Sequence, residues 1–191
     1  MSIQSRRERE RAERHQLIVT AAREMAEAEG WDAVTTRRLA ARIEYSQPVL
    51  YSHFRGKEAI MRAAALEGIA ELADRLRAAR AGAADDEAAL RAFATAYVEF
   101  AAAQPALYAA MFTLTSDLSF GTDQSPAVLK AAFGEFAAVV RPLAGPGTDE
   151  ETLAETFWAA LHGLVALDGS HRLRPGRTAD RVDLLVARFL R

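Results

Sequence analysis

The residues of this chain that could read a nucleic acid lie in one short stretch, residues 36–57. Two helix-sized segments, 36–43 and 47–53, follow a longer amphipathic segment there and are separated by a turn of about three residues. This arrangement has the dimensions of a helix-turn-helix unit. In such a unit the first helix crosses the phosphate backbone, and small or polar side chains at the N-terminal end of the second reach the base edges. Here that end carries Gln47, Pro48 and Val49.

The elements that must position this unit are all predicted to be helical. Apolar residues recur at helical spacing along the chain, and no alternating strand pattern is present. The expected fold class is all-α, with an N-terminal three-helix helix-turn-helix domain over residues 1–58, a C-terminal helical bundle over residues 59–191 and about nine helices. A helix over 57–80 links the two domains. We predict the other helices over 6–29, 85–103, a short stretch from Pro105, 126–143, 149–168 and 178–190.

Local signals predict where several of these helices begin and end. Gly30 ends the first helix, since glycine most cheaply adopts the left-handed conformation found beyond a helix C-terminus. We expect Ser46 to cap the helix that begins at residue 47, and Thr148 with Glu151 to form a capping box. Leu17 is predicted to lie on the buried stripe of the first helix.

The composition excludes several classes of protein. The 191 residues contain 24 Lys and Arg, 26 Asp and Glu and no cysteine, which rules out disulfides and thiolate chemistry. No hydrolase elbow, phosphate loop or dinucleotide fingerprint is present, so we expect neither enzyme activity nor a cofactor. The four histidines are widely separated, which argues against a metal site. Without a secretory signal or a long apolar segment, we expect a cytoplasmic location and no membrane contact.

Two blocks of residues give the chain a family resemblance. The first block resembles the tetracycline-repressor (TetR) family of bacterial transcription regulators over about residues 14–65, through Ala21-Ala22, Gly30, Thr35–Ala40, Gln47–Phe54 and Lys57-Glu58. The second block is similar to one branch of that family. It comprises residues 97–100, 104–108 and 111–112 and a Trp-x-x-x-His-Gly motif at residues 158–163.

The resemblance implies a role for each matching residue of the first block. Three residues face the major groove and read bases: Gln47, Pro48 and Val49. Five contact phosphates and fix position without reading sequence: Thr36, Arg37, Tyr51, His53 and Lys57. Core packing is the alternative role for Tyr51 and His53. The arginines of residues 6–11 either form a basic arm over DNA or belong to a solvated helical face.

One residue departs from the family pattern. Glu44 occupies the turn position at which most members have glycine. A left-handed conformation at a residue with a Cβ costs on the order of 1 kcal/mol, and a carboxylate near DNA adds repulsion. The departure supports an alternative function, a helical ligand-binding and dimerisation module with impaired sequence-specific DNA binding.

For the C-terminal part, the resemblance implies a ligand cavity and a dimer interface. A mainly hydrophobic small molecule suits a cavity with few polar groups. The candidate pocket residues are Phe93, Tyr97, Phe100, Tyr108, Met111, Phe112, Trp158 and His162. Most of these aromatic residues must also serve the core, and a hydrogen-bonded core histidine is the alternative for His162. The last two helices are expected to pair with those of a second copy through Leu161, Leu164, Val165, Val182, Leu185, Val186 and Phe189.

Together these features imply a homodimeric repressor. Its expected partners are a palindromic operator in double-stranded DNA, a second copy of the chain and a small-molecule effector that releases the DNA.

Overall fold

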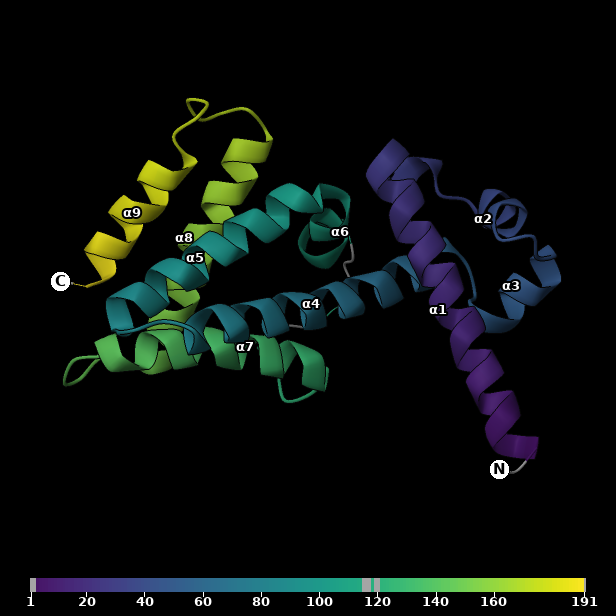
Figure 1. Cartoon of the computed structure of the whole chain (residues 1–191), viewed down its shortest axis with the longest axis horizontal. Helices are drawn as coiled ribbons and strands as arrows, with labels where there is room; N and C mark the ends of the chain where they lie inside the picture. Colours follow the sequence, from purple (N-terminus) through teal and green to yellow (C-terminus); the bar gives the residue numbers. More distant parts are fainter. Residues whose placement is uncertain (1–2, 115–117, 119–120, 191) are drawn as a thin grey trace. The chain divides into compact units, whose positions relative to one another are not determined.

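The computed structural model describes residues 3–114, 118 and 121–190. Within these residues the chain forms nine α-helices and no strand, which confirms the all-α prediction (Figure 1). The helices are α1 (Ile3–Glu29), α2 (Thr36–Arg42), α3 (Gln47–His53), α4 (Lys57–Ala81), α5 (Asp86–Ala103), α6 (Pro105–Ala109), α7 (Ala127–Val140), α8 (Glu150–Gly169) and α9 (Thr178–Phe189). Three shorter helical turns accompany them: η1 (Trp31–Ala33), η2 (Ala110–Leu114) and η3 (Arg141–Leu143).

The chain divides into two compact units, and neither is a single stretch of sequence. The first unit comprises Met1–Gly68 and Gln104–Leu118, and the second comprises Ile69–Ala103 and Ser119–Arg191. Helix α4 therefore continues from one unit into the other. The domain boundary between residues 58 and 59 stays a prediction.

In the first unit, α2 packs against both α1 and α3, and α6 also packs against α1. Leu17, predicted to face the core, is 43% exposed, whereas Val19 is fully buried. Successive helix residues are about 100° apart, so residues 17 and 19 lie on opposite sides of Ile18, and the packed neighbours lie on the side of Val19. The main buried side chains of this unit are Ile18, Val19, Met25, Trp31, Val34, Leu39, Leu50, Phe54 and Ile60.

In the second unit, helices α5, α7, α8 and α9 surround an aromatic core. Phe93 of α5 lies edge-on to Phe136 of α7, with ring centroids 5.0 Å apart, and 6.1 Å from Phe157 of α8. Helix α4 is joined to α7 by a buried carboxylate, because Glu135 accepts hydrogen bonds from Arg77 at 2.8 Å and Arg80 at 3.1 Å.

The observed helix caps correct two local predictions. Asp149, and not Thr148, caps α8, because its carboxylate accepts hydrogen bonds from the amide and the hydroxyl of Thr152 at 2.8 and 2.6 Å. These bonds lower the pKa of Asp149, and a charged acceptor at a helix N-terminus is stabilised by the helix dipole. Ser46 occupies the cap position of α3, but its side chain makes no capping hydrogen bond. Gly30 ends α1 as predicted and has a positive φ of 82°, but its ψ of 158° lies outside the left-handed helical region.

None of the helices in the described residues has the length and apolar character needed to span a membrane.

Candidate functional site

The N-terminal end of α3 presents the three predicted base-reading residues to solvent. Gln47, Pro48 and Val49 are all exposed, and Val49 is 37% accessible. Leu50, the next residue, is completely buried and anchors the helix to the first unit. Proline fits the first turn of a helix, where the missing amide hydrogen has no helical partner. The short helix is thus held by its buried side and offers its first turn to a partner.

The turn before α3 is closed by Glu44 in a left-handed conformation, with a φ of 57°. The amide of Glu44 donates to the carbonyl of Ala41 at 3.4 Å, and the amide of Tyr45 donates to that of Ala40 at 2.9 Å. This pair of bonds is the Schellman motif that often ends a helix. The turn therefore adopts the glycine-type geometry although a side chain is present, and the Glu44 side chain is exposed.

The predicted phosphate-contacting residues lie along the accessible ends of α2, α3 and α4. The hydroxyl oxygens of Thr36 and Tyr51 are 3.3 Å apart, so one can donate to the other across the two helices. Tyr51 is 52% exposed, which argues against the alternative of a purely core role. Arg37 is exposed, and Lys57, at the start of α4, lies 4.0 Å from a carboxylate oxygen of Asp32.

His53 is half-buried at the end of α3 and faces other basic groups. Its pKa is lowered by burial and by the nearby positive charges of Arg11, His15 and Arg14. The ring of His15 stacks on Phe54, with centroids 4.4 Å apart. Because Arg11 and Arg14 belong to α1, the first helix brings positive charge to the predicted phosphate contacts.

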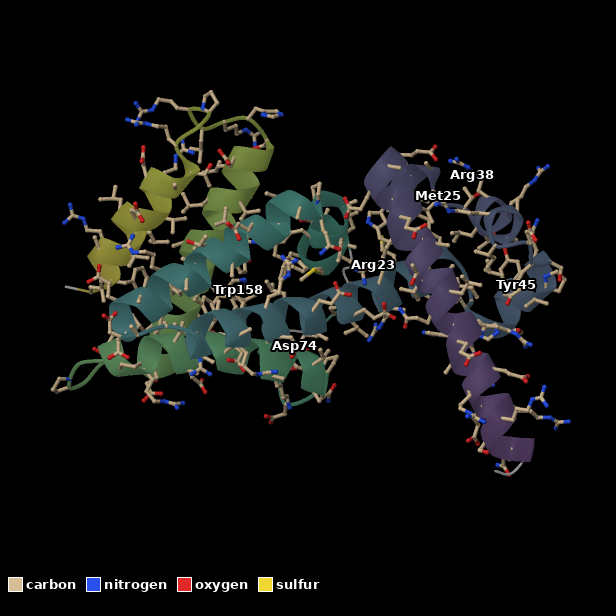
Figure 2. All side chains as sticks on the ribbon, in the orientation of Figure 1. Arg23, Met25, Arg38, Tyr45, Asp74 and Trp158 are labelled. Carbon is tan, nitrogen blue, oxygen red and sulfur yellow. The ribbon has the colours of Figure 1, made fainter. Side chains whose placement is uncertain are left out.

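Two arginines of α2 have a structural role that the sequence analysis missed. Arg38 donates both Nη2 hydrogen bonds to the carboxylate of Glu29 at 2.8 and 2.9 Å, and Arg42 donates to Glu24 at 2.8 Å. Arg38 is labelled in Figure 2. Both pairs join α2 to α1 and so fix the frame on which α3 is mounted. The acidic residues of α1 were the feature of the sequence that could have indicated these ion pairs.

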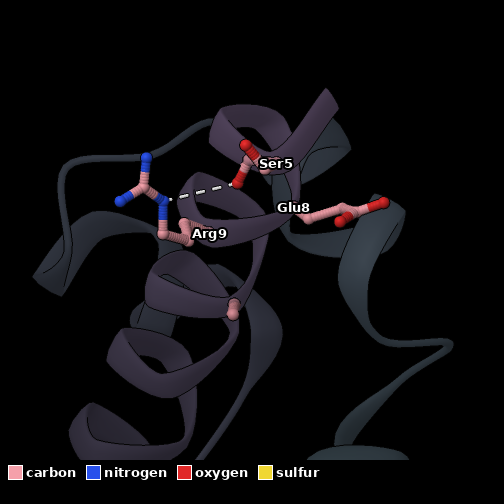
Figure 3. A pocket seen from close by; sticks show the side chains of 4 residues that line it. Ser5, Glu8 and Arg9 are labelled. Atoms are coloured by element: carbon pink, nitrogen blue, oxygen red, sulfur yellow. Dashed lines mark hydrogen bonds between the residues drawn. The ribbon is translucent and has the colours of Figure 1, made fainter. Parts of the chain in front are cut away.

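A pocket on the first turns of α1 is lined by Ser5, Glu8, Arg9 and Ala12, whose side chains are drawn in Figure 3. Arg9 donates to the backbone carbonyl of Ser5 at 3.4 Å within the same helix. The arginines of residues 6–11 therefore belong to helix α1, and their contact with DNA stays a prediction.

The eight predicted pocket residues are divided between the two units. Tyr108, Met111 and Phe112 belong to the first, in which the rings of Tyr108 and Phe112 lie 4.9 Å apart. The other five belong to the second unit: Phe93, Tyr97, Phe100, Trp158 and His162.

Within the second unit, a hydrogen bond joins two of these residues. The indole N–H of Trp158, which is labelled in Figure 2, donates to the hydroxyl of Tyr97 at 3.1 Å. Phe93, Tyr97 and Phe100 are fully buried. His162 is partly buried, and burial lowers its pKa because the imidazolium is poorly solvated there.

The predicted dimer-interface residues also separate into two groups. Leu161, Val182 and Val186 are buried inside the single chain, at 0%, 4% and 0% exposure, and therefore serve its own core. The remaining four are partly exposed: Leu164, Val165, Leu185 and Phe189. Two more strongly exposed apolar residues beside them were missed, Leu167 at 41% and Leu184 at 58%. Helical periodicity places Val182, Val186 and Leu185 on one apolar stripe. It does not show which side of the stripe faces the core of the chain and which side faces solvent.

Among the described residues, no group of three or more His, Asp or Glu side chains is arranged to hold a metal ion.

Two family sequence profiles match the chain. The profile described as "Bacterial regulatory proteins, tetR family" matches residues 18–64, and the profile described as "Tetracyclin repressor-like, C-terminal domain" matches residues 90–190. The HTH-type transcriptional regulator Rv0681 of Mycobacterium tuberculosis is 34% identical over 154 residues, which are 79% of this chain and 68% of that protein.

Solved structures have a similar fold. A protein of unknown function from Rhodococcus sp. RHA1 has a TM-score of 0.76 and 24% identity, over 92% of this chain and 93% of its own. The regulator FadR of Bacillus subtilis, solved in complex with stearoyl-CoA, has a TM-score of 0.68 and 14% identity, over 90% of this chain and 97% of its own. At these sequence identities, the similarity shows a shared fold alone.

Proposed function

Because the chain belongs to the tetracycline-repressor family of bacterial transcription regulators, which are not enzymes, we propose that it represses transcription as a ligand-responsive homodimer. Two copies bind a palindromic operator, with their α3 helices in successive major grooves roughly 35 Å apart. A small, mainly hydrophobic molecule releases the DNA.

The observation that carries the DNA-binding proposal is the exposed first turn of α3, held from behind by buried Leu50. Gln47 can pair with the N6 and N7 atoms of adenine, and the apolar atoms of Pro48 and Val49 can contact a thymine methyl group. These three residues are the proposed readers of sequence.

A second set of residues is proposed to contact phosphates: Thr36, Arg37, Tyr51, His53 and Lys57. The exposed Arg37 is available for such a contact, and Lys57 lies at the positive end of the α4 dipole. The hydrogen bond between Thr36 and Tyr51 would hold two contacts in one register. Phosphate contacts supply affinity that is independent of sequence and falls as salt rises.

Dimerisation is proposed through the outer faces of α8 and α9. Apolar side chains that remain accessible in the single chain support this face, namely Leu164, Val165, Leu167, Leu184, Leu185 and Phe189. A symmetric pair of copies would bury them in a four-helix arrangement. We leave Leu161, Val182 and Val186 out of the interface because they are already buried.

The effector site is proposed among the aromatic residues of α5 and α8. Phe93, Tyr97, Phe100 and Trp158 supply apolar surface, and His162 adds one polar group. An apolar lining with few polar groups favours a hydrophobic ligand, the class to which the acyl chain bound by the Bacillus subtilis regulator belongs. The effector and DNA would weaken each other's binding by the same factor, since coupling between two sites is reciprocal.

The test is selection of genomic DNA fragments on the purified protein at two salt concentrations. A single palindromic motif that persists at the higher salt is the expected result. Sequence-independent binding that disappears with salt, or no binding, would contradict the proposal and favour a ligand-binding module without operator recognition. Equilibrium titration of the selected fragment with and without a series of fatty acyl compounds then tests release by the effector.

A further inference from the structure

The N-terminus of α6 is capped by a residue far away in the sequence. Helix α6 begins at Pro105, and the residue at its cap position, Gln104, makes no side-chain capping bond. The carboxylate of Glu27, on α1, accepts hydrogen bonds from the amides of Ala106 at 3.1 Å and Leu107 at 2.8 Å. These amides have no partner within the helix, so a charged side chain of α1 supplies what α6 lacks.

Two further hydrogen bonds tie the same segment to α1. The buried indole of Trp31 donates from Nε1 to the carbonyl of Ala106 at 2.8 Å, and Arg23 donates to the side-chain oxygen of Gln104 at 3.0 Å. Charge-assisted bonds such as those of Glu27 are roughly twice as strong as neutral ones. We name the bonds from Glu27, Trp31 and Arg23 to residues 104–107 the Glu27 clasp.

The other side of the segment lies against α4. A Cβ on Gly68 would approach the sulfur of Met111 at 2.9 Å and the side chain of Leu107 at 3.0 Å. Gly68 is also buried. The absence of a side chain at Gly68 therefore lets the segment pack directly on α4, while the Glu27 clasp holds it to α1.

The chain connects this segment to the proposed effector site. Helix α5, which contains Phe93, Tyr97 and Phe100, ends at Ala103, and α6 begins two residues later. The segment nevertheless belongs to the same compact unit as α1, α2 and α3. The backbone therefore leads directly from the end of α5 to residues that are hydrogen-bonded to α1.

From these contacts we infer that Glu27 is a positioning residue that couples residues 104–111 to the helix-turn-helix. The inference rests on the proposed function. It assigns to the clasp a linkage, in addition to helix α4, between the helix-turn-helix and residues 104–111. If the helix-turn-helix binds DNA best when the segment is clasped, reciprocity requires that bound DNA also stabilise the clasped segment. This stabilisation can be measured without knowing the effector.

The experiment is amide hydrogen exchange of the full-length protein, free and saturated with the operator fragment recovered by the selection. In the wild-type protein, DNA is expected to slow exchange of the Ala106 and Leu107 amides. In Glu27→Ala, these amides should exchange at least about tenfold faster without DNA, the effect expected of a lost charged hydrogen bond. In this variant, saturating DNA should no longer slow the exchange of these two amides.

Two variants control for a general loss of stability. Glu24→Ala removes a carboxylate from the same helix and breaks its bond to Arg42 but does not touch the segment, so DNA should still slow exchange at Ala106 and Leu107. Glu27→Gln retains a neutral acceptor, should fold, and is expected to give intermediate exchange rates and partial DNA-dependent slowing.

Slowing by DNA that persists unchanged in Glu27→Ala, or that is absent from the wild-type protein when the complex is fully formed, would overturn the coupling role. Failure to form any DNA complex would instead overturn the proposed function, and the coupling role with it. The binding measurement distinguishes these outcomes.

Discussion

The two compact units hold their candidate functional residues in opposite environments. In the first unit, Gln47, Pro48 and Val49 are exposed on a helix that a buried leucine holds in place. In the second, Phe93 and Tyr97 are completely buried within an aromatic cluster. An exposed residue on a rigid frame can be changed without disturbing the fold, so its function is separable from stability. A buried aromatic residue serves stability first, and any ligand contact must be distinguished from packing.

The largest expected effect distinguishes the inner from the outer edge of α9. Val186→Asp places an unpaired charge where the side chain is fully buried, so we expect a loss of more than about 3 kcal/mol in the free energy of unfolding. Leu184→Asp changes a residue that is 58% exposed and should leave the fold intact while it converts the proposed dimer to a monomer. Urea denaturation and light scattering measure the two quantities. A folded, stable Val186→Asp protein or an unchanged mass for Leu184→Asp would contradict the respective assignment.

In the first unit, substitutions of Gln47 and Lys57 should change DNA binding and leave stability unaltered. Gln47→Ala is expected to lower discrimination at one base pair by about 1–3 kcal/mol. Lys57→Ala should weaken binding to all sequences and reduce the slope of log affinity against log salt by about one. Competition titrations with specific and random DNA at several salt concentrations separate these effects. Equal losses on both DNAs for Gln47→Ala would remove its assignment as a base reader.

A smaller effect concerns the two non-glycine residues with a positive φ, Glu44 at 57° and His171 at 56°. Both follow a helix and close the same type of turn, with the amide of Arg172 donating to Leu167 at 2.9 Å in the second case. Replacement by glycine removes a cost on the order of 1 kcal/mol, part of which is offset by greater entropy of the unfolded chain.

Glu44→Gly and His171→Gly should therefore both raise the free energy of unfolding slightly, as measured by urea denaturation. Only Glu44→Gly should also tighten DNA binding, because it removes a carboxylate near the proposed interface. A similar gain in DNA affinity for His171→Gly would show that the gain does not come from removing a charge near the proposed interface.

The pH dependence of stability provides the finest comparison. Burial lowers the pKa of His162 in the folded protein, so the unfolded chain binds a proton more readily. Stability should consequently fall as the pH drops below about 6.5, the ordinary pKa of histidine. His162→Gln should reduce this loss when urea midpoints are compared at neutral and acidic pH. The pKa of His53 is also lowered, so His53 should still contribute to the loss of stability at acidic pH in this variant. An unchanged pH dependence in His162→Gln would contradict burial of His162 as the cause.

The extent of successful prediction differs between local and long-range features. The limits of α2 and α3 follow from the positions of Thr35, Ser46 and the apolar residues, and the structure places both helices within one residue of expectation. The predicted cap of α8, Thr148, was one residue too early. Thr148 and Asp149 are both good capping residues, and a pattern of residue types does not rank them. The bonds of Arg38 and Arg42 were missed because each joins two different helices, and their packing against each other is not visible in a residue pattern.

The sequence by itself determined the helical fold class and the helix-turn-helix, because these depend on periodicity, turn residues and spacing within short segments. The family followed from the resemblance of its residue motifs to those of known regulators. Only the tertiary structure decided which side of each apolar stripe is buried, as the contrast between Val186 and Leu184 shows. It also brought Glu27 to the amides of Ala106 and Leu107. Such a contact depends on how helices pack in three dimensions, and the spacing of residues along one helix carries no information about the partner it meets.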